Sequence, residues 1–218
     1  MSQMIRIAAR EEFQRDELTG MYRLRAKVFK ERMGWDVPIL DGMEVDGYDA
    51  LDPYYMMISE PDNKPGNRVR GCWRLLPTEG PYMLKDTFPE LLHGHAAPAY
   101  AHVWELSRFA IETSCCRSFG FANLALESMR EIVTFGDRMG IERYVTVTTT
   151  AIERLLRRAG VDIERFGPPI LIGAEQSVAL NIDIGEQTHA ALFGPIPLLP
   201  EPMRWGQDTA PSRSFAIP

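Results

Sequence analysis

Acidic and basic side chains in the first half of the chain have the types needed to hold a zwitterion. Glu44, Asp46 and Asp49 lie close together, and Arg74 and Arg108 follow in later segments. Carboxylates would bind the ammonium group of an amino acid and arginines its carboxylate, because such charge-assisted hydrogen bonds are strong and arginine offers a carboxylate two donors. The same residues could instead pair with one another in a structural ion-pair network, and the sequence leaves both interpretations open.

Arg25 and two aromatic residues extend this set. Arg25 falls on the apolar face of a helix predicted over residues 16–31. An unpaired guanidinium there would be very costly unless an anion lies nearby or the side chain reaches the surface. Phe29 and Trp35 could flank a sulfonium or an adenine, since aromatic faces attract cations and stack on purines.

A strand predicted over residues 104–111 carries further polar groups. Glu105 and Ser107 share one face of this strand, and Arg108 points to the other face if the strand is regular. The motif Arg117-x-x-Gly120-x-Ala follows, just before a helix predicted over residues 121–139. A glycine-containing turn from strand to helix presents backbone N–H groups that bind phosphate. The spacing resembles the degenerate phosphate loop of Gcn5-related N-acyltransferases, which bind a pantetheine donor there.

Three arginines form one face of a short helix near residues 150–160. Arg154, Arg157 and Arg158 are spaced three and four residues apart, opposite an apolar face. Such a face is often simply solvated, but three arginines on an acidic protein favour an acidic partner. Thr150 and Glu153 have the capping-box pattern that would open this helix, and Ala159-Gly160 would close it.

The elements that must position these residues alternate between strands and helices. The long loop 36–53 carries many acids, and loops of this length are often functional. We expect an α/β (α+β) fold in which a central mixed sheet is flanked by helices. Besides residues 104–111, the predicted strands are residues 3–8 at an edge, 54–59 and 68–76 as a hairpin, 144–149, 177–184 and 188–193.

Composition narrows the class of protein. The chain has 218 residues, 45% of them hydrophobic, and a net charge of -6 from 24 Lys+Arg against 30 Asp+Glu. We expect one domain over residues 1–194 and an irregular, proline-rich tail over residues 195–218. The acidic balance disfavours nucleic acid and anionic membranes as partners. Adjacent cysteines cannot form a C-x-x-C zinc pair, so we expect no metal site. The sequence has no apolar stretch long enough to span a membrane and no recognisable signal peptide, so we expect the protein in the cytoplasm.

Eight residues in register resemble the signature of the acyl-homoserine-lactone synthases, the LuxI family of autoinducer synthases. Local strings such as LRAKVFKERMGWDV, EVDGYDALDPYYM and WELSRFAI are similar to the LasI-like branch, and the resemblance covers residues 5–193. The tail after Gly194 departs from the family pattern. The signature residues are Arg25, Phe29, Trp35, Asp46, Asp49, Arg74, Glu105 and Arg108.

The resemblance implies a fold and a reaction. The fold is acyltransferase-like (GNAT-like), with a V-shaped cleft between splayed central strands. The substrates are S-adenosylmethionine (SAM) and an acyl-carrier-protein thioester, and no prosthetic group is needed. The methionyl amine attacks the thioester to give an amide, and the carboxylate then displaces methylthioadenosine and closes a lactone. Rival interpretations are a general N-acyltransferase that uses acyl-CoA and another amine, and a non-catalytic SAM or carrier-protein sensor.

The resemblance also implies roles for single residues. Glu105 is the candidate base, acting directly or through water, because the attacking amine must be neutral. Thr148 corresponds to a position that accompanies 3-oxoacyl donors, although an ordinary strand threonine is the alternative. We expect catalytic roles for Glu105, Asp46 and Arg108; a SAM pocket of Arg25, Phe29, Trp35, Asp49, Arg74 and Ser107; acyl or pantetheine contacts from Thr148, Arg117, Gly120 and Phe109; and carrier-protein docking at Arg154, Arg157 and Arg158.

Overall fold

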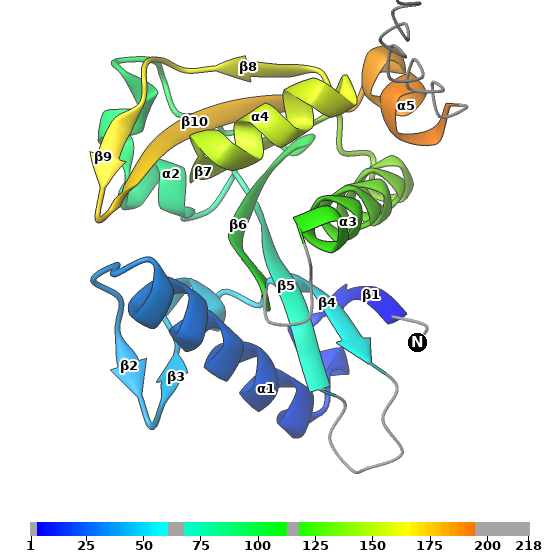
Figure 1. The fold of residues 1–218 in the computed structure, drawn as a ribbon. Helices are drawn as coiled ribbons and strands as arrows, with labels where there is room; N and C mark the ends of the chain where they lie inside the picture. Colours follow the sequence, from blue (N-terminus) through cyan, green and yellow to red (C-terminus); the bar gives the residue numbers. More distant parts are fainter. Residues whose placement is uncertain (1–3, 61–67, 113–117, 195–218) are drawn as a thin grey trace, which may run out of the picture.

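The structure, a computed structural model, describes residues 4–60, 68–112 and 118–194. It contains an eight-stranded mixed sheet with helices on both faces (Figure 1), which confirms the predicted fold class. The strand order is β1-β4-β5-β6-β7-β10-β8, and β9 also pairs with β10. The strands are β1 (Met4–Ala9), β4 (Tyr54–Glu60), β5 (Arg68–Pro77), β6 (Val103–Ile111), β7 (Arg143–Thr149), β8 (Ile163–Arg165), β9 (Ile170–Ile172) and β10 (Glu175–Asp183).

Helices and a small hairpin complete the fold. The α-helices are α1 (Arg15–Arg25), α2 (Met83–Asp86), α3 (Ser118–Met139), α4 (Thr150–Ala159) and α5 (Glu186–Phe193). The hairpin is β2 (Ile39–Leu40) and β3 (Met43–Glu44), and the remaining turns are η1 (Arg10–Glu12), η2 (Ala26–Arg32), η3 (Gly47–Ala50) and η4 (Pro89–Leu92). In the described ranges, no helix has the length and apolar character needed to cross a membrane.

Both faces of the sheet are buried, which explains the nearly continuous apolar run in β4. Successive side chains of a strand point to opposite faces. Met56 and Ile58 therefore pack in the core that contains residues of α3, whereas Tyr55 and Met57 pack in the core that contains Met21 of α1. Burial on both sides replaces the alternation of apolar and polar residues with an unbroken hydrophobic segment.

The two central parallel strands separate along their length and open a cleft. The pairing of β6 with β7 runs from Val103 opposite Arg143 to Leu106 opposite Thr146. Beyond this point β6 continues with β5 as its partner, and β7 continues with β10. The sheet thus divides into two halves, which confirms the V-shaped cleft that the family resemblance implied.

A bulge in β6 corrects the prediction for Arg108. The register between β5 and β6 shifts so that Cys72 faces Ala110 and Arg74 faces Ser107. The backbone of Arg108 has φ of 58°, in the left-handed region. The strand is not regular here, so Arg108 does not simply turn away from the face of Ser107; the bulge redirects its guanidinium.

One prediction near the end of the chain is wrong, and another falls on residues that the structure does not describe. Residues 188–193 belong to helix α5 and not to a strand, because Thr188 and Leu192 are buried one helical turn apart. The Thr188 hydroxyl donates to the carbonyl of Asp183 at 2.6 Å and accepts from the N–H of Asp162 at 3.1 Å, and these contacts tie α5 to the sheet. The predicted tail, residues 195–218, lies outside the described residues.

The predicted boundaries of two other helices change. The N-cap of α4 is Thr149 and not Thr150, and no side chain caps this helix; the carboxylate of Glu153 binds arginines. The helix predicted over residues 16–31 is divided into α1 and the wider π-helical segment η2. Single π-helical turns often occur at functional sites, and η2 contains the buried Phe29.

Candidate active site

Three arginines and three acids form a closed ring of alternating charge beside the cleft. The ring brings together α1, the β2–β3 hairpin, η3 and the paired strands β5 and β6. All six side chains are at most 10% exposed. In order around the ring, each residue in an ion pair with the next, they are Arg25, Glu44, Arg108, Asp46, Arg74 and Asp49, which pairs again with Arg25.

The contacts of Asp49 show how tightly the ring is held. Arg25 donates two hydrogen bonds to its carboxylate at 2.7 and 2.9 Å, and Arg74 donates one at 2.9 Å. The hydroxyl of Tyr55 donates a further bond at 2.6 Å. Burial by itself would raise the pKa of Asp49, but the two guanidinium groups outweigh it and hold the pKa well below its usual range. Asp49 is therefore ionised at neutral pH.

The ring shows that these charged residues pair with one another, which is one of the two interpretations that the sequence allowed. Its charges satisfy one another, and the buried Arg25, Asp49 and Arg74 line neither of the two cavities described below. Asp46 and Arg108 differ because both reach a cavity wall. Arg108 contacts Glu44 and Asp46 at 2.8 Å each, yet burial lowers its pKa.

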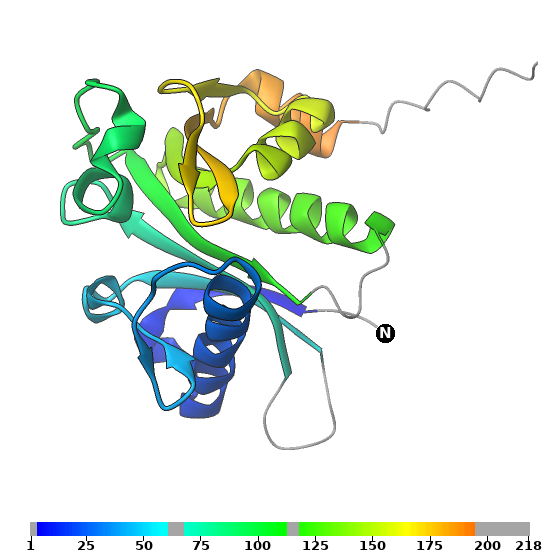
Figure 2. The same cartoon turned by 60° about the vertical axis from the view of Figure 1, so that its left-hand side comes forward.

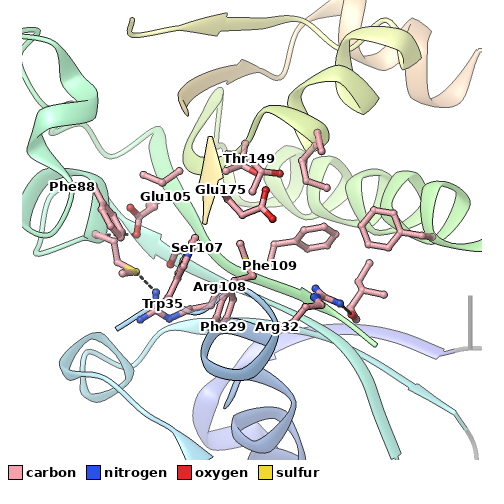
Figure 3. Close-up of a pocket in the computed structure, with 18 residues that line it drawn as sticks. Phe29, Arg32, Trp35, Phe88, Glu105, Ser107, Arg108, Phe109, Thr149 and Glu175 are labelled. Atoms are coloured by element: carbon pink, nitrogen blue, oxygen red, sulfur yellow. Dashed lines mark hydrogen bonds between the residues drawn. The ribbon is translucent and has the colours of Figure 1, made fainter. Parts of the chain in front are cut away.

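A cavity of about 280 Å³ fills the opening between β6 and β7 (Figure 3), and we call it the cleft cavity. Glu105 lies on one wall, Trp35, Phe29 and Arg32 lie below, and Thr149 lies above. Most of the remaining lining is apolar. It includes Met33, Met83, Phe88, Phe109, Ile111, Phe121, Val147, Ala151 and Ile152.

A second cavity of about 500 Å³ adjoins the first, and we call it the side cavity. Its walls come from residues 34–38, from Asp46, Tyr48 and Arg108, from Met83 of α2 with the following Thr87 and Phe88, and from Ile172 and Gly173 at the β9–β10 turn. The two cavities share four lining residues, so they meet at a common wall. These residues are Trp35, Met83, Phe88 and Arg108.

Glu105 occupies the wall of the cleft cavity at the start of α2. Its side chain is fully buried, and its two oxygens accept hydrogen bonds from the N–H groups of Met83 at 3.0 Å and Leu84 at 2.7 Å. Burial raises the pKa of Glu105 above its ordinary value, and the two amides oppose this rise. A carboxylate has about four lone-pair positions, so the two amides do not fill its capacity to accept hydrogen bonds. Sequence reasoning missed Met83, because the atom that matters is a backbone N–H and no side-chain pattern signals it.

Aromatic rings form the wall between the two cavities. The rings of Phe29 and Trp35 stack with their centroids 5.3 Å apart, and Phe88 lies 6.3 Å from Trp35 in a tilted arrangement. The Arg108 guanidinium lies 5.3 Å from the Phe29 ring centroid. The structure therefore brings the two sequence-predicted aromatic residues together. It adds Phe88, which the sequence pattern did not single out.

The predicted acyl-contact residues fall into two groups. Thr148 and Phe109 line the cleft cavity, and Thr149 lines it as well, although the sequence did not indicate Thr149. Gly120 lies in the first turn of α3, where backbone N–H groups lack partners within the helix. Arg117 lies outside the described residues. Ser107 lines the cleft cavity too, and its hydroxyl accepts a hydrogen bond from Arg74 at 3.2 Å.

The arginine face of α4 is exposed, but its three members differ. Arg157 contacts Glu153 at 3.1 Å, and Arg165 of β8 binds the same buried carboxylate at 2.7 and 2.5 Å. Hydrogen bonds from these arginines lower the pKa of Glu153, against the effect of burial. Within the described ranges, Arg154 and Arg158 have no acidic partner, so they offer charge to a ligand.

The described residues include no cluster of three histidine, cysteine, aspartate or glutamate side chains that could hold a metal ion.

Known proteins resemble this chain in both sequence and structure. Residues 9–192 match the family model described as autoinducer synthase. The acyl-homoserine-lactone synthase of Pseudomonas aeruginosa is 52% identical over 191 residues, which cover 88% of this chain and 94% of that protein. The crystal structure of the AHL synthase LasI matches with a TM-score of 0.83 at 51% identity, covering 88% of this chain and 95% of that one.

Two further structures place the fold in a wider group. BjaI, a CoA-dependent acyl-homoserine lactone synthase solved with SAM and isopentyl-CoA, matches with a TM-score of 0.75 at 30% identity and 88% coverage of both chains. A Lactobacillus plantarum protein, whose structure is described as that of a putative N-acetyltransferase, matches with a TM-score of 0.56 at 15% identity, over 85% of this chain and all of that one. This last likeness concerns the fold alone, and it confirms the predicted acyltransferase-like architecture.

Proposed function

Because the chain belongs to the autoinducer synthase family and is an acyl-homoserine-lactone synthase, we propose that its substrates are SAM and a 3-oxoacyl thioester of medium to long chain carried by acyl carrier protein. The observation that carries this proposal is the meeting of two cavities at one wall. The side cavity would take SAM, the cleft cavity would take the acyl chain, and the reacting groups would meet near Glu105.

The side cavity has the chemistry for SAM. Asp46 supplies negative charge at its wall, and Arg108 supplies positive charge beside it. Trp35 and Phe88 offer ring faces that attract a sulfonium and stack on an adenine. The ring of ion pairs behind Asp46 and Arg108 fixes both side chains, so the site is preorganised and little ordering is left for binding. In this proposal Arg25, Asp49 and Arg74 shape the SAM pocket from behind and do not touch the ligand.

Two bonds form in the proposed reaction. The methionyl amine attacks the thioester carbonyl, the carrier thiol leaves, and the proton of the amine passes to Glu105, directly or through a water. The raised pKa of Glu105 suits this task, because a general base works best when its pKa approaches the working pH. The methionyl carboxylate then attacks the γ-carbon, and methylthioadenosine leaves with the electron pair of the C–S bond. This second step needs positioning more than proton transfer, because the sulfonium is already a good leaving group.

The cleft cavity suits an acyl chain. Its lining is mostly aromatic and aliphatic, with Phe109, Phe121 and Ile152 among the contributors. Thr148 adds a hydroxyl that can donate to a 3-oxo group. The N-terminus of α3, with Gly120 in its first turn, is a suitable site for the phosphate of the pantetheine arm.

Helix α4 supports a carrier protein as the donor. Ala151 and Ile152 of this helix line the cleft cavity, while Arg154 and Arg158 are exposed on the same helix. A bound acidic carrier would therefore sit next to the cavity that takes its acyl chain. Acyl-CoA is the second candidate donor, because BjaI is CoA-dependent, and it would not need the arginine face.

A competition experiment separates the two donors. The purified protein is given SAM with equal amounts of the same 3-oxoacyl group on acyl carrier protein and on CoA, one of them isotopically labelled. Mass spectrometry of the lactone then reports which donor was used. We expect the label of the carrier protein to dominate, whereas a product derived mainly from CoA would overturn the proposed donor.

A further inference from the structure

The turn between β9 and β10 reaches across the cleft to the opposite half of the molecule. In Figure 2 it extends from the upper half toward the blue segment that follows α1. Ile172 and Gly173 line the side cavity, and Glu175, at the start of β10, lines the cleft cavity. The turn therefore touches both substrate cavities, although none of its residues belongs to the charged ring.

Gly173 brings the backbone of this turn close to the other half. Its φ is 61°, in the left-handed region that favours glycine. A Cβ atom at this position would lie 2.9 Å from Cδ1 and 3.5 Å from Nε1 of Trp35, and 3.4 Å from the carbonyl oxygen of Met33. The backbone of the turn thus rests on the edge of the Trp35 indole.

The contact with Gly173 completes the packing around Trp35. One face of the indole stacks on Phe29 at 5.3 Å, and Phe88 leans against it at 6.3 Å. Among the described residues, Trp35 Nε1 is buried without a hydrogen-bond partner, so packing is what holds this edge of the ring. Moving the turn would move Trp35, which lines the side cavity.

We propose that Gly173 is a positioning residue for SAM, because its bare backbone holds the Trp35 indole against Phe29 and closes the side cavity. The inference rests on the proposed function, which assigns SAM to that cavity. It adds the β9–β10 turn, from the half of the sheet opposite Trp35, to the SAM site.

The test is the Gly173→Ala variant, measured for SAM binding by calorimetry and for steady-state kinetics. The added methyl group should displace the indole edge, and loss of one aromatic contact weakens binding by about two- to tenfold. We therefore expect the Kd and KM for SAM to rise by about that factor, with a smaller change in the KM for the acyl donor and in kcat.

Gly140→Ala is the matched control. Gly140 has φ of 70°, and no described atom lies within 4 Å of its ideal Cβ, so this variant carries the same backbone strain without the contact. Its SAM binding should equal that of the wild type. If Gly173→Ala fails to fold, Gly173→Asn takes its place, because asparagine tolerates the left-handed region and still carries a Cβ.

A double-mutant cycle assigns the effect to the indole. In a Trp35→Ala background, Gly173→Ala should cause little further loss of SAM affinity, since the indole that the added methyl group would displace is absent. Equal SAM affinity in wild type and Gly173→Ala, or additive losses in the cycle, would overturn the inference. Absence of SAM binding by the wild type would instead contradict the proposed function.

Discussion

Glu105 combines full burial with two backbone hydrogen bonds on the wall of the cleft cavity. Replacing it with glutamine removes the proton acceptor and presents an NH₂ group to backbone donors. We expect Glu105→Gln to lower the single-turnover rate of amide formation about a hundredfold or more, the usual contribution of a general base, while the fold is retained. Circular dichroism checks the fold, and quenched-flow product analysis gives the rate.

Glu175→Gln is the control for this variant, because Glu175 lines the same cavity but is exposed. It should lose far less activity. The pH profile of the wild-type rate is a second measurement. The rate should fall as pH decreases, because protonated Glu105 cannot accept the proton of the amine. The midpoint of this fall should lie above the ordinary glutamate pKa of 4.5, because burial raises the pKa of Glu105. Near wild-type turnover in Glu105→Gln would give this residue a purely structural role.

We expect Thr148 to influence which acyl donor the enzyme prefers. One neutral hydrogen bond to a 3-oxo group contributes about 0.5–1.5 kcal/mol, which corresponds to a preference of about two- to tenfold. Thr148→Val keeps the shape of the side chain and removes the donor. The ratio of 3-oxo to unsubstituted product should therefore fall by that factor, while total synthesis with saturating carrier-protein donors stays largely intact.

Thr149→Val provides the comparison, because Thr149 also lines the cleft cavity. A fall in the product ratio in this variant alone would move the hydrogen bond to the neighbouring residue. An unchanged ratio in both variants would show that neither hydroxyl reads the 3-oxo group.

Helix α4 is the element where carrier docking and the acyl cavity meet. Arg154 and Arg158 are exposed, whereas Arg157 is occupied by the buried Glu153. Because a charge at the rim of an interface mainly affects the association rate, Arg154→Glu with Arg158→Glu should raise the KM for acyl carrier protein and reduce its salt dependence. The Kd for SAM should not change.

Arg157→Glu should behave differently in the same assay. It places a second negative charge beside Glu153, so its main effect should be on stability rather than on the KM for the carrier. Wild-type kinetics of the Arg154, Arg158 double variant at low salt would rule out docking on this helix face.

The elements differ in how far the sequence predicts them. The apolar run of β4 and the β-branched run of β7 predict strands, because burial favours these residue types in sheets. Helix α5 is not predicted, because its sequence contains a short β-like run and its helical state depends on contacts of Thr188 with the sheet. The bulge at Arg108 is also unpredicted: no glycine marks it, and only pairing with β5 reveals it.

The features of the candidate site also divide into those that the sequence predicts and those that it does not. The charged residues are recognisable by type and order, but their closure into one ring depends on several elements that fold onto one another. The sequence does not indicate Met83 or Phe88 as site residues. Met83 donates a hydrogen bond to Glu105 through its backbone N–H, and Phe88 lies in an ordinary apolar segment.

At the scale of the whole molecule, the ring links α1 to the sheet and to the β2–β3 hairpin. Removing one partner of a buried ion pair costs about 3–5 kcal/mol, because the remaining charge is left uncompensated. We expect Asp49→Asn to lower the free energy of unfolding in urea by an amount of this order. Asp36→Asn, at an exposed residue, should change it by less than about 0.5 kcal/mol.

The same ring sets the response to acid. The pKa of Asp49 is lower in the folded state than in the unfolded state, so its contribution to stability is complete above the unfolded value near 3.8 and is lost as pH falls below it. The free energy of unfolding of the wild type should therefore decline more steeply below about pH 4 than that of Asp49→Asn. Parallel curves would mean that Asp49 titrates alike in both states.

In the proposed reaction, one cleft holds two substrates and two bonds form between them. To test this reaction, the purified protein is incubated with SAM and 3-oxoacyl carrier protein. Methylthioadenosine and N-acyl-homoserine lactone are then quantified together by mass spectrometry. Both products should form in equal amounts, and each should require both substrates. Acyl transfer to another amine without release of methylthioadenosine, or a protein that binds SAM and forms neither product, would contradict the proposed reaction.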